Sequence, residues 1–512
     1  MNYDIVIKNG LLIDGSGALG KKADIGIVGD VIMAIGDLQG ADAERILDAN
    51  GMVVCPGFID VHVHSELALL GGPDKYAPLK MGVTTQLASP DGFSWAPLQR
   101  NLLKEMKDYL NVFYDDECID ISKDLTLERF LSLFKGNIPS NIVLQVPHAS
   151  VRLAAMGWKD SWATDDEIKV MEKITREWME MGAKAFATGL EYEPMRRSDL
   201  RELVALSKVV SEYGGIYVAH QRGYGNNVHL GCKETFSIGR LAEIPVHISH
   251  LAIDPLAAEQ VDYGVKQGVD ITFEMYPYPA GCTHLLLYLP EDAQVGSPED
   301  VKERLKDRAF REKISVQVEK AFNPIKNVRF ASVRTPQPMG WEGKSLDTVQ
   351  EELGLNLTDT VCDIILMSGF RALAIYHWED KLHPYLEATY KHPLHMVGTD
   401  GIYIGNRPHP RGYGSYPKIL GEYVRDNKWL TLEQAIYKMS GFPAKRFNIK
   451  SRGILMEGNY ADIVVFDPSE IEGTATFEQP RSEPKGIHHV MVNGHFVISD
   501  GIVKDGNYGR IL

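Results

Sequence analysis

Two histidines stand one residue apart in the stretch CPGFIDVHVHSE, which runs from Cys55 to Glu66. Side chains two residues apart in a β-strand point to the same side, so His62 and His64 would face one spot. A bound metal ion is one reason to aim two imidazoles at one place. Two polar histidines with ordinary partners are the alternative, and the pair alone leaves both interpretations open.

Residues of the same chemistry follow other short apolar runs along the chain. They are His148, His220, His250 and Asp400. In a (β/α)8 (TIM) barrel, functional side chains lie at the C-terminal ends of the strands. A barrel would therefore gather these residues with the first histidine pair, and so many metal-type ligands at one end favour a metal centre. We expect His148 to lie behind the site, where it would orient other groups.

Eight apolar runs that alternate with longer amphipathic stretches could form the strands of such a barrel. They read MVVCPGFID, VTTQLAS, NIVLQVPH, AKAFAT, GIYVAH, IPVHIS, GVDITFEMY and LHMVGTD. The sequence therefore predicts an α/β fold with a (β/α)8 barrel over residues 56–446. The last gap, from Tyr276 to His395, is too long for one connection and predicts an insertion at about 284–345.

The two ends of the chain have a different pattern. Residues 1–55 and 447–512 contain short alternating segments separated by Asn-Gly, Gly-Asp and Asp-Gly turns, which are typical of β-hairpins. Each end is too short for a domain of its own. We expect both termini to pair into one small β-sandwich domain.

Composition narrows the class of protein. A net charge of −15 over 512 residues argues against a nucleic-acid partner and an acidic membrane surface. No apolar run reaches the ~18 residues of a membrane span, and the N-terminus lacks a signal-peptide pattern. The five cysteines are scattered, without a CxxC pair, which is typical of a reducing compartment. We expect a cytoplasmic enzyme with a small-molecule substrate; the oligomeric state is open, and a homo-oligomer is compatible with the sequence.

Longer stretches resemble a known family. PGFIDVHVH, GVTTQLASPDGFSWAPL, GAKAFATGLEY, YVAHQRG, HISH, MYPYPAG, GTDG, HPRGYGSYPKILGEYVR and RGILMEGNYADIVVFDP are similar to the amidohydrolase superfamily, most closely its N-acyl-D-amino-acid deacylase (D-aminoacylase) branch. The resemblance covers nearly the whole chain. It implies the barrel, the β-sandwich from both termini and a hydrolytic site with one or two zinc ions.

The resemblance also assigns roles to individual residues. His62 and His64 match the more exposed metal position, whereas His220 and His250 match the tighter one. Asp400 matches the acidic residue that transfers protons and borders the metal.

Two further residues match the substrate site of the branch. Tyr276 matches the tyrosine that polarises the scissile carbonyl, and Arg411 matches the arginine that holds the substrate carboxylate.

Three positions depart from the branch. At the position where the branch usually has a cysteine ligand, this chain has Asp91, in SPDG. The lysine that the branch usually has after the sixth strand is replaced, with Ala252 two residues after His250, and its usual serine is Cys282. The first change alters the metal site, and the other two remove a cation and a hydroxyl from the substrate site. They predict poor activity on standard N-acetyl-D-amino acids and better activity on a less polar or differently shaped amide.

Lys184 could replace the missing cysteine. Other amidohydrolases carry a lysine in the fourth strand that is carboxylated and bridges two metals; a salt bridge to Asp91 or Glu191 is the alternative for this chain. We expect carboxylated Lys184 as the bridge with Asp91 beside it, and oxygen ligands would let manganese or cobalt replace zinc more readily.

Three functions follow in order of preference. The first is a metal-dependent hydrolase of a non-peptide C–N (amide) bond, similar to the N-acyl-D-amino-acid deacylases, in which metal-activated water attacks and Asp400 moves the proton. The second is a cyclic-amide hydrolase of the hydantoinase or dihydropyrimidinase kind. The third is a scaffold that has lost its metal.

Overall fold

Eight parallel strands form a closed barrel in the computed structural model, which describes residues 2–512 without the side chains of residues 379–382. In chain order they are β8 (Phe58–Asp60), β10 (Val83–Leu87), β11 (Asn141–Val143) with β12 (Gln145–Pro147), β13 (Ala185–Gly189), β14 (Ile216–His220), β15 (Val246–Ile248), β16 (Ile271–Glu274) and β20 (His395–Met396). Each strand pairs in parallel with the next. The barrel closes where β21 (Gly401–Ile402) pairs with β9 (Val63–His64), so the eight predicted runs are confirmed as its strands.

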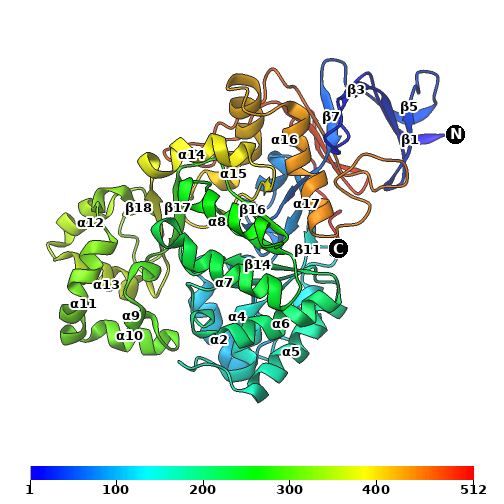
Figure 1. Ribbon diagram of the computed structural model, residues 1–512. Coiled ribbons are helices and arrows are strands. Elements are labelled where there is room, and N and C mark those ends of the chain that lie inside the picture. Colours follow the sequence, from blue (N-terminus) through cyan, green and yellow to red (C-terminus); the bar gives the residue numbers. More distant parts are fainter. Residues whose placement is uncertain (1) are drawn as a thin grey trace.

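Helices follow most of these strands and cover the barrel (Figure 1). They are α1 (Ala77–Lys80), α2 (Arg100–Leu110), α3 (Leu127–Ser132), α4 (His148–Met156), α5 (Asp165–Glu180), α6 (Leu200–Glu212), α7 (Val228–Leu241), α8 (Pro255–Lys266), α14 (Glu379–Lys391), α15 (Arg411–Lys418), a π-helix (Ile419–Asp426), α16 (Leu432–Met439) and α17 (Gly441–Arg446). Side-chain caps start several of them: Thr164 begins α5 in a capping box with Glu167, and Asp254 caps α8. No helix of the described chain is long and apolar enough to cross a membrane.

Both termini contribute to two packed sheets at one side of the barrel. One sheet holds β1 (Tyr3–Lys8), β4 (Asp24–Val28), β5 (Val31–Gly36) and β6 (Ala43–Asp48); the other holds β2 (Leu11–Leu12), β3 (Lys21–Lys22), β7 (Val53–Pro56), β22 (Ile463–Phe466), β23 (Ile487–Val492), β24 (His495–Ser499) and β25 (Ile502–Val503). β7 pairs antiparallel with β22, which joins the two ends of the chain. Side chains of both sheets share one buried cluster, and β7 continues into β8 after Gly57, which fixes the start of the barrel.

The predicted insertion is longer than 284–345. It contains a three-stranded antiparallel sheet of β17 (Ala280–His284), β18 (Val328–Val333) and β19 (Ala372–His377). Its helices are α9 (Glu291–Gln294), α10 (Pro298–Lys306), α11 (Arg308–Ala321), α12 (Leu346–Leu353) and α13 (Leu357–Ser368), seen in lime green at the left of Figure 1. The predicted end at residue 345 is wrong because the middle strand of this sheet, β19, comes after α13.

Candidate metal centre

The first histidine pair meets Asp400 at the closing seam of the barrel. The Nε2 atoms of His62 and His64 lie 3.6 and 3.4 Å from Asp400 Oδ1. The Asp400 amide donates a 2.7 Å hydrogen bond to the His62 carbonyl, which fixes the two chain segments in register. All three residues are buried, so they form a compact group of two imidazoles and one carboxylate.

A second group lies beside the first. His250 Nε2 is 3.0 Å from His220 Nδ1, and that nitrogen is 3.7 Å from Asp91 Oδ1. Asp91 also approaches the first group, with Oδ1 3.6 Å from His62 Nε2 and Oδ2 3.6 Å from His64 Nε2. Asp91 therefore stands between the two groups, where the departure from the family's cysteine predicts a ligand.

These separations fit metal ligands better than direct hydrogen bonds. At 3.4–3.7 Å the facing nitrogen and oxygen atoms are too far apart for strong hydrogen bonds. Ligands at about 2.0–2.2 Å from a tetrahedral zinc ion lie roughly 3.3–3.6 Å from one another. His62 Nε2 and Asp91 Oδ1 are buried without a hydrogen-bond partner in the described structure. A cation between them would satisfy both atoms.

Three of these residues adopt backbone angles that are rare outside glycine. The φ angles are 54° at Asp91, 40° at His250 and 50° at Asp400, all in the left-handed region. Such conformations cost free energy and persist where the surrounding structure imposes them, most often at functional sites. The fold therefore holds the three side chains in place at some cost in stability.

A second layer of side chains fixes the other ring nitrogens. His62 Nδ1 lies 2.9 Å from Glu274 Oε1, His64 Nδ1 lies 2.9 Å from the Tyr114 hydroxyl, and His220 Nε2 lies 3.0 Å from Glu191 Oε2. Hydrogen bonds of this kind set the tautomer and aim the free nitrogen at a metal.

Glu274 links the two groups of ligands. Beside its contact with His62, it accepts a 3.0 Å hydrogen bond from the backbone amide of His250 and contacts the His247 ring. This role is not among the sequence predictions, although a glutamate inside the apolar run GVDITFEMY, at the same end of the barrel as His220 and His250, is a usable signal. Tyr114 is not among them either, and Glu191 is predicted only as a partner of Lys184.

The charges of the site favour a bound cation. Burial would raise the pKa of the Asp91 carboxyl, but the imidazoles of His62, His220 and His64 outweigh it and hold the pKa below its usual range. Burial would lower the pKa of the His62 imidazole, but the Asp91 and Asp400 carboxylates outweigh burial and raise that pKa. A proton and a metal ion would compete for the space between these carboxylates and imidazoles.

His250 differs from the other imidazoles. Burial and the neighbouring His220 lower the pKa of His250 to about 4. It is therefore neutral near pH 7, which is the form that binds a metal.

Arg411 lies against Asp400. Its Nη1 is 2.9 Å from Asp400 Oδ2, its Nη2 donates a 3.3 Å hydrogen bond to the Cys282 carbonyl, and its guanidinium carbon lies 4.5 Å from the centre of the Tyr276 ring. Arg411 is fully buried and does not line the cavity next to the metal ligands. The structure pairs it with the carboxylate of Asp400, and its predicted contact with a substrate carboxylate stays a prediction.

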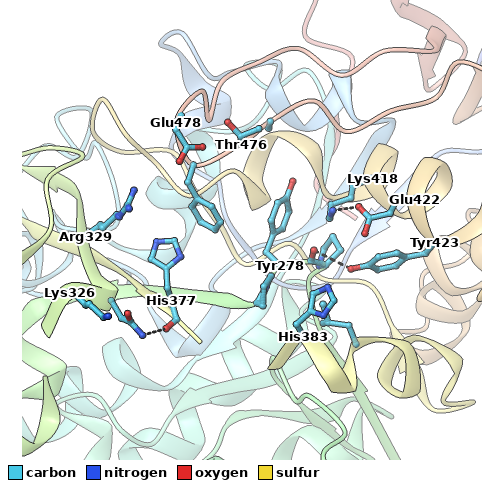
Figure 2. Close-up of a pocket in the computed structure, with 16 residues that line it drawn as sticks. Tyr278, Lys326, Arg329, His377, His383, Lys418, Glu422, Tyr423, Thr476 and Glu478 are labelled. Atoms are coloured by element: carbon cyan, nitrogen blue, oxygen red, sulfur yellow. Dashed lines mark hydrogen bonds and ion pairs between the residues drawn. The ribbon is translucent and has the colours of Figure 1, made fainter. Parts of the chain in front are cut away.

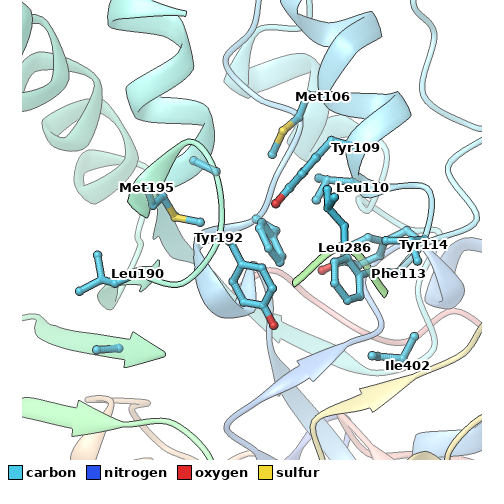
Figure 3. Packing of buried hydrophobic residues seen from close by; sticks show 14 of the residues in the cluster. Met106, Tyr109, Leu110, Phe113, Tyr114, Leu190, Tyr192, Met195, Leu286 and Ile402 are labelled. Carbon is cyan, nitrogen blue, oxygen red and sulfur yellow. The ribbon is translucent and has the colours of Figure 1, made fainter. Parts of the chain in front are cut away.

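A cavity of about 740 Å³ opens from the ligand groups. Tyr276, Cys282 and Ala252 all line it, as the resemblance implies for the substrate site. Burial raises the pKa of the Cys282 thiol to about 12, so the thiol is neutral and Cys282 offers no charge to a ligand. Phe113 and Tyr192, which Figure 3 shows among the buried hydrophobic residues, form another wall. The Phe113 ring is stacked on His64, and the Tyr192 ring lies against His220.

Lys184 does not reach this site. It directly precedes β13, and the parallel register places Gly189, five residues further on, opposite His220. At about 3.3 Å per residue, Lys184 lies roughly 16 Å from the strand end that carries the ligands. It is partly exposed at the opposite end of the barrel. The predicted carboxylated Lys184 bridge is therefore wrong, because the lysine precedes its strand and the candidate ligands lie at the opposite, C-terminal ends of the barrel strands.

A second cavity, of about 600 Å³, is lined by other residues of the loop between β16 and β17. Tyr276 lines the first cavity, whereas Tyr278 lines the second, together with Lys326, Arg329 and the ion pair of Lys418 and Glu422 (Figure 2). None of the metal-ligand candidates lines this second cavity.

Comparison with known proteins agrees with this geometry. The family described as the Amidohydrolase family matches residues 366–498. A D-aminoacylase from Alcaligenes xylosoxydans xylosoxydans is 33% identical over 525 residues, covering 100% of this chain and 97% of that protein. The solved structure of N-acyl-D-glutamate deacylase from Bordetella bronchiseptica, complexed with zinc and a phosphonate inhibitor, shows 30% identity, a TM-score of 0.84 and 100% coverage of both chains.

A more distant likeness concerns the fold alone. D-hydantoinase from Thermus sp. has a TM-score of 0.58 and 17% identity, with 99% of this chain and 98% of that chain covered. Full-length similarity above 30% identity is shared with the deacylases instead. The chain belongs to the D-aminoacylase branch of the amidohydrolase family.

Proposed function

We propose that the protein is a metal-dependent hydrolase of a non-peptide amide bond, of the N-acyl-D-amino-acid deacylase type. One observation carries the proposal: Asp91 stands within 3.7 Å of imidazole nitrogens from both ligand groups, in a buried site that opens into a cavity. Relatives with full-length similarity include a D-aminoacylase and the N-acyl-D-glutamate and N-acyl-D-aspartate deacylases, which supports this reading over a cyclic-amide hydrolase.

The metal ligands follow from the two groups. His62, His64 and Asp400 would hold one ion, and His220 with His250 would hold the other, with Asp91 shared between them. We propose zinc, in one or two copies, with manganese or cobalt as substitutes because one ligand is an oxygen where the branch uses sulfur. When bound, such an ion lowers the pKa of water to about 7 and polarises a carbonyl.

The chain's own residues supply the proton transfers. Asp400 Oδ1 faces the ligand group while Oδ2 is held by Arg411, so Asp400 can accept a proton from water and pass it to the leaving nitrogen. Burial raises the pKa of Asp400, but the Arg411 guanidinium outweighs this and keeps the pKa low, so the carboxylate starts the cycle ionised.

Tyr276 supplies the complementary group. Burial raises the pKa of its hydroxyl above its usual value, so it remains protonated and can donate a hydrogen bond to the carbonyl oxygen as negative charge develops there. Its ring lies over the Arg411 guanidinium, which fixes its position in the cavity wall.

Two further proposals concern the whole protein. The five cysteines are free in the structure, which supports a cytoplasmic location, and the substrate is a small molecule, with no nucleic acid or membrane required. We also assign residues 1–55 and 447–512 to a β-sandwich domain, on the shared core of their two sheets.

The test combines metal analysis with an amide panel. The purified protein is depleted with a chelator, assayed for bound metal, and then reloaded with zinc, manganese or cobalt. We expect hydrolysis of an acyclic N-acyl compound to disappear and return with the metal. Hydrolysis of hydantoin or dihydrouracil alone would favour the cyclic-amide alternative, and a chain that binds no metal would support the scaffold.

A further inference from the structure

We propose that Glu66 is a positioning residue of the metal centre, which fixes both the tautomer of His64 and the loop that carries Asp91. The inference rests on the proposed function, because it needs a metal ion bound by these two ligands. Glu66 stands two residues after His64, and its side chain is buried, with 1% of the residue exposed.

A buried carboxyl at this place is costly in its immediate surroundings. Glu66 forms no ion pair within the part of the chain that the structure describes, and its Oε2 atom is buried there without a hydrogen-bond partner. Burying a carboxyl group without a cation, or a polar atom without a partner, costs free energy of folding. The contacts of the other oxygen, Oε1, are therefore the ones that require an acceptor at this position.

Glu66 Oε1 accepts hydrogen bonds from two sides. The Ser89 amide donates one of 3.0 Å, and the Tyr114 hydroxyl donates another of 3.5 Å, the outer limit for such a bond. The two donors belong to different connections of the barrel, because Ser89 follows β10 and Tyr114 follows α2. One carboxyl oxygen thus connects the segment after His64 with both of them.

The Tyr114 contact determines which nitrogen of His64 is free for a metal ion. His64 Nε2 faces Asp400, whereas Nδ1 lies 2.9 Å from the Tyr114 hydroxyl. A metal ion at Nε2 requires the proton on Nδ1, so Nδ1 donates to the Tyr114 oxygen. The hydroxyl proton then needs another acceptor, which is Glu66 Oε1. Without that acceptor the hydroxyl could donate to Nδ1, and the imidazole proton would move to Nε2 and block the metal.

The Ser89 contact holds the loop that carries Asp91. The φ angles of Ser89 and Asp91 are 60° and 54°, both in the left-handed region, so the loop is strained where it approaches the ligands. The bond to Glu66, together with a 3.0 Å hydrogen bond from Gln145 Nε2 to the Ala88 carbonyl, ties the loop on both sides. Because Asp91 is shared by the two ligand groups, a shift of this loop would change both proposed metal positions.

The zinc affinity of matched variants tests the inference, measured by competition with a chelating dye. Glu66→Leu removes both hydrogen bonds and should lower the affinity about 10–100-fold, the range typical of partners of metal-bound histidines. Glu66→Gln keeps a carbonyl oxygen for both donors and should stay within about threefold of the wild type. Tyr114→Phe removes only the contact with His64 and should fall between these two.

A double variant separates the two contacts. Adding Glu66→Leu to Tyr114→Phe should lower the zinc affinity further, because the hydrogen bond from Ser89 is also lost. Glu66→Leu should in addition change the visible absorption of the cobalt-loaded protein, because a displaced ligand alters the geometry around the ion.

Asp462→Asn is the control for the loss of a buried carboxyl. Asp462 is paired with Arg452 and accepts a 3.0 Å hydrogen bond from Asn141 at the start of β11, the end of the barrel opposite the ligands. This variant should keep the zinc affinity and the cobalt spectrum even where it lowers the free energy of unfolding.

The outcomes separate this inference from the proposed function. An unchanged zinc affinity in Glu66→Leu, or a Glu66→Gln variant as weak as Glu66→Leu, would overturn the inference. If Glu66→Leu does not fold, equal zinc affinities of Tyr114→Phe and the wild type would overturn it as well. A wild type that binds zinc but hydrolyses no amide would contradict the proposed function alone, and a wild type that binds no zinc would contradict both.

Discussion

Arg411 and Asp400 form a fully buried ion pair, with Nη1 of the arginine 2.9 Å from Oδ2 of the aspartate. The other oxygen of Asp400 faces His62 and His64, so one carboxylate connects the guanidinium to the ligand group. Arg411 thereby sets the charge and direction of the carboxylate that we propose as the proton carrier, and no described lysine or arginine side chain lines the adjoining cavity.

The first prediction follows from this pair. Asp400→Asn should keep most of the bound metal but lower kcat about 10²–10⁴-fold, because a carboxamide cannot accept the proton. His220→Ala should instead lose metal. Metal content and kcat measured on the same preparations separate the two effects, and near-normal turnover by Asp400→Asn would rule out its role in proton transfer.

The second prediction concerns pH. The Arg411 guanidinium lowers the pKa of Asp400 against the effect of burial, so Arg411→Met should raise that pKa. Since the reaction needs the ionised carboxylate, activity would then be lost at a higher pH on the acidic side of the profile. Arg411→Lys keeps the charge and should shift the acidic limb less. A kcat/KM profile from pH 4 to 9 measures this, and identical acidic limbs would contradict the linkage.

The third prediction tests Asp91 as the ligand shared by the two groups. Asp91→Ala should lose metal from both positions, because Asp91 lies between the groups, whereas Asp91→Cys should restore binding with a sulfur ligand. Lys184→Ala is the matched control and should keep full metal content and activity. Elemental analysis after dialysis is the measurement. Metal loss in Lys184→Ala, rescued by short carboxylic acids, would return the bridge to Lys184.

The barrel could be predicted from the sequence because its strands are nearly continuous apolar runs. The eight runs correspond to the eight barrel strands, and the ligands in His-x-His, HISH and GTDG stand at the ends of their strands. The register of a parallel sheet then brings them together, as in the pairing of Gly401 with Val63. Recognition of the family supplied the roles that spacing alone left open.

The errors have physical causes as well. Lys184 stands at the N-terminal end of AKAFAT, whereas the functional side chains of a barrel follow its strands, so the prediction gave too much weight to which strand carries the lysine and too little to its position along that strand. The role of Tyr114 depends on a contact with a residue far apart in the chain, which no local pattern records, whereas Glu274 could have been noticed as a charged residue inside an apolar run. The insertion was predicted too short because five α-helices and β18 separate β17 from its sheet partner β19, so no local pattern links the two strands.

The fourth prediction concerns a buried charge cluster outside the metal centre. Glu202 contacts His148 at 2.8 Å and is paired with Arg152, and all three side chains are inaccessible to solvent. Arg152→Leu leaves the carboxylate without its cation and should cost about 3–5 kcal/mol of unfolding free energy. Denaturant unfolding of the metal-loaded protein measures the loss. The double variant with Glu202→Gln should be less destabilised than the sum of the single variants, and strict additivity would contradict the coupling.

The last prediction concerns Glu274, which joins the two ligand groups through His62 and the amide of His250. Glu274→Gln preserves the size of the side chain and one acceptor oxygen. It removes the negative charge that makes the His62 imidazole a stronger metal ligand. Partners of metal-bound histidines typically contribute 10–100-fold in metal affinity, so we expect a loss of that size. Competition with a chelating dye measures the affinity, and kcat at saturating metal should fall less than the affinity. Glu422→Gln, a carboxyl in the second cavity, is the control, and equal metal affinity in the two variants would show that Glu274 does not support the centre.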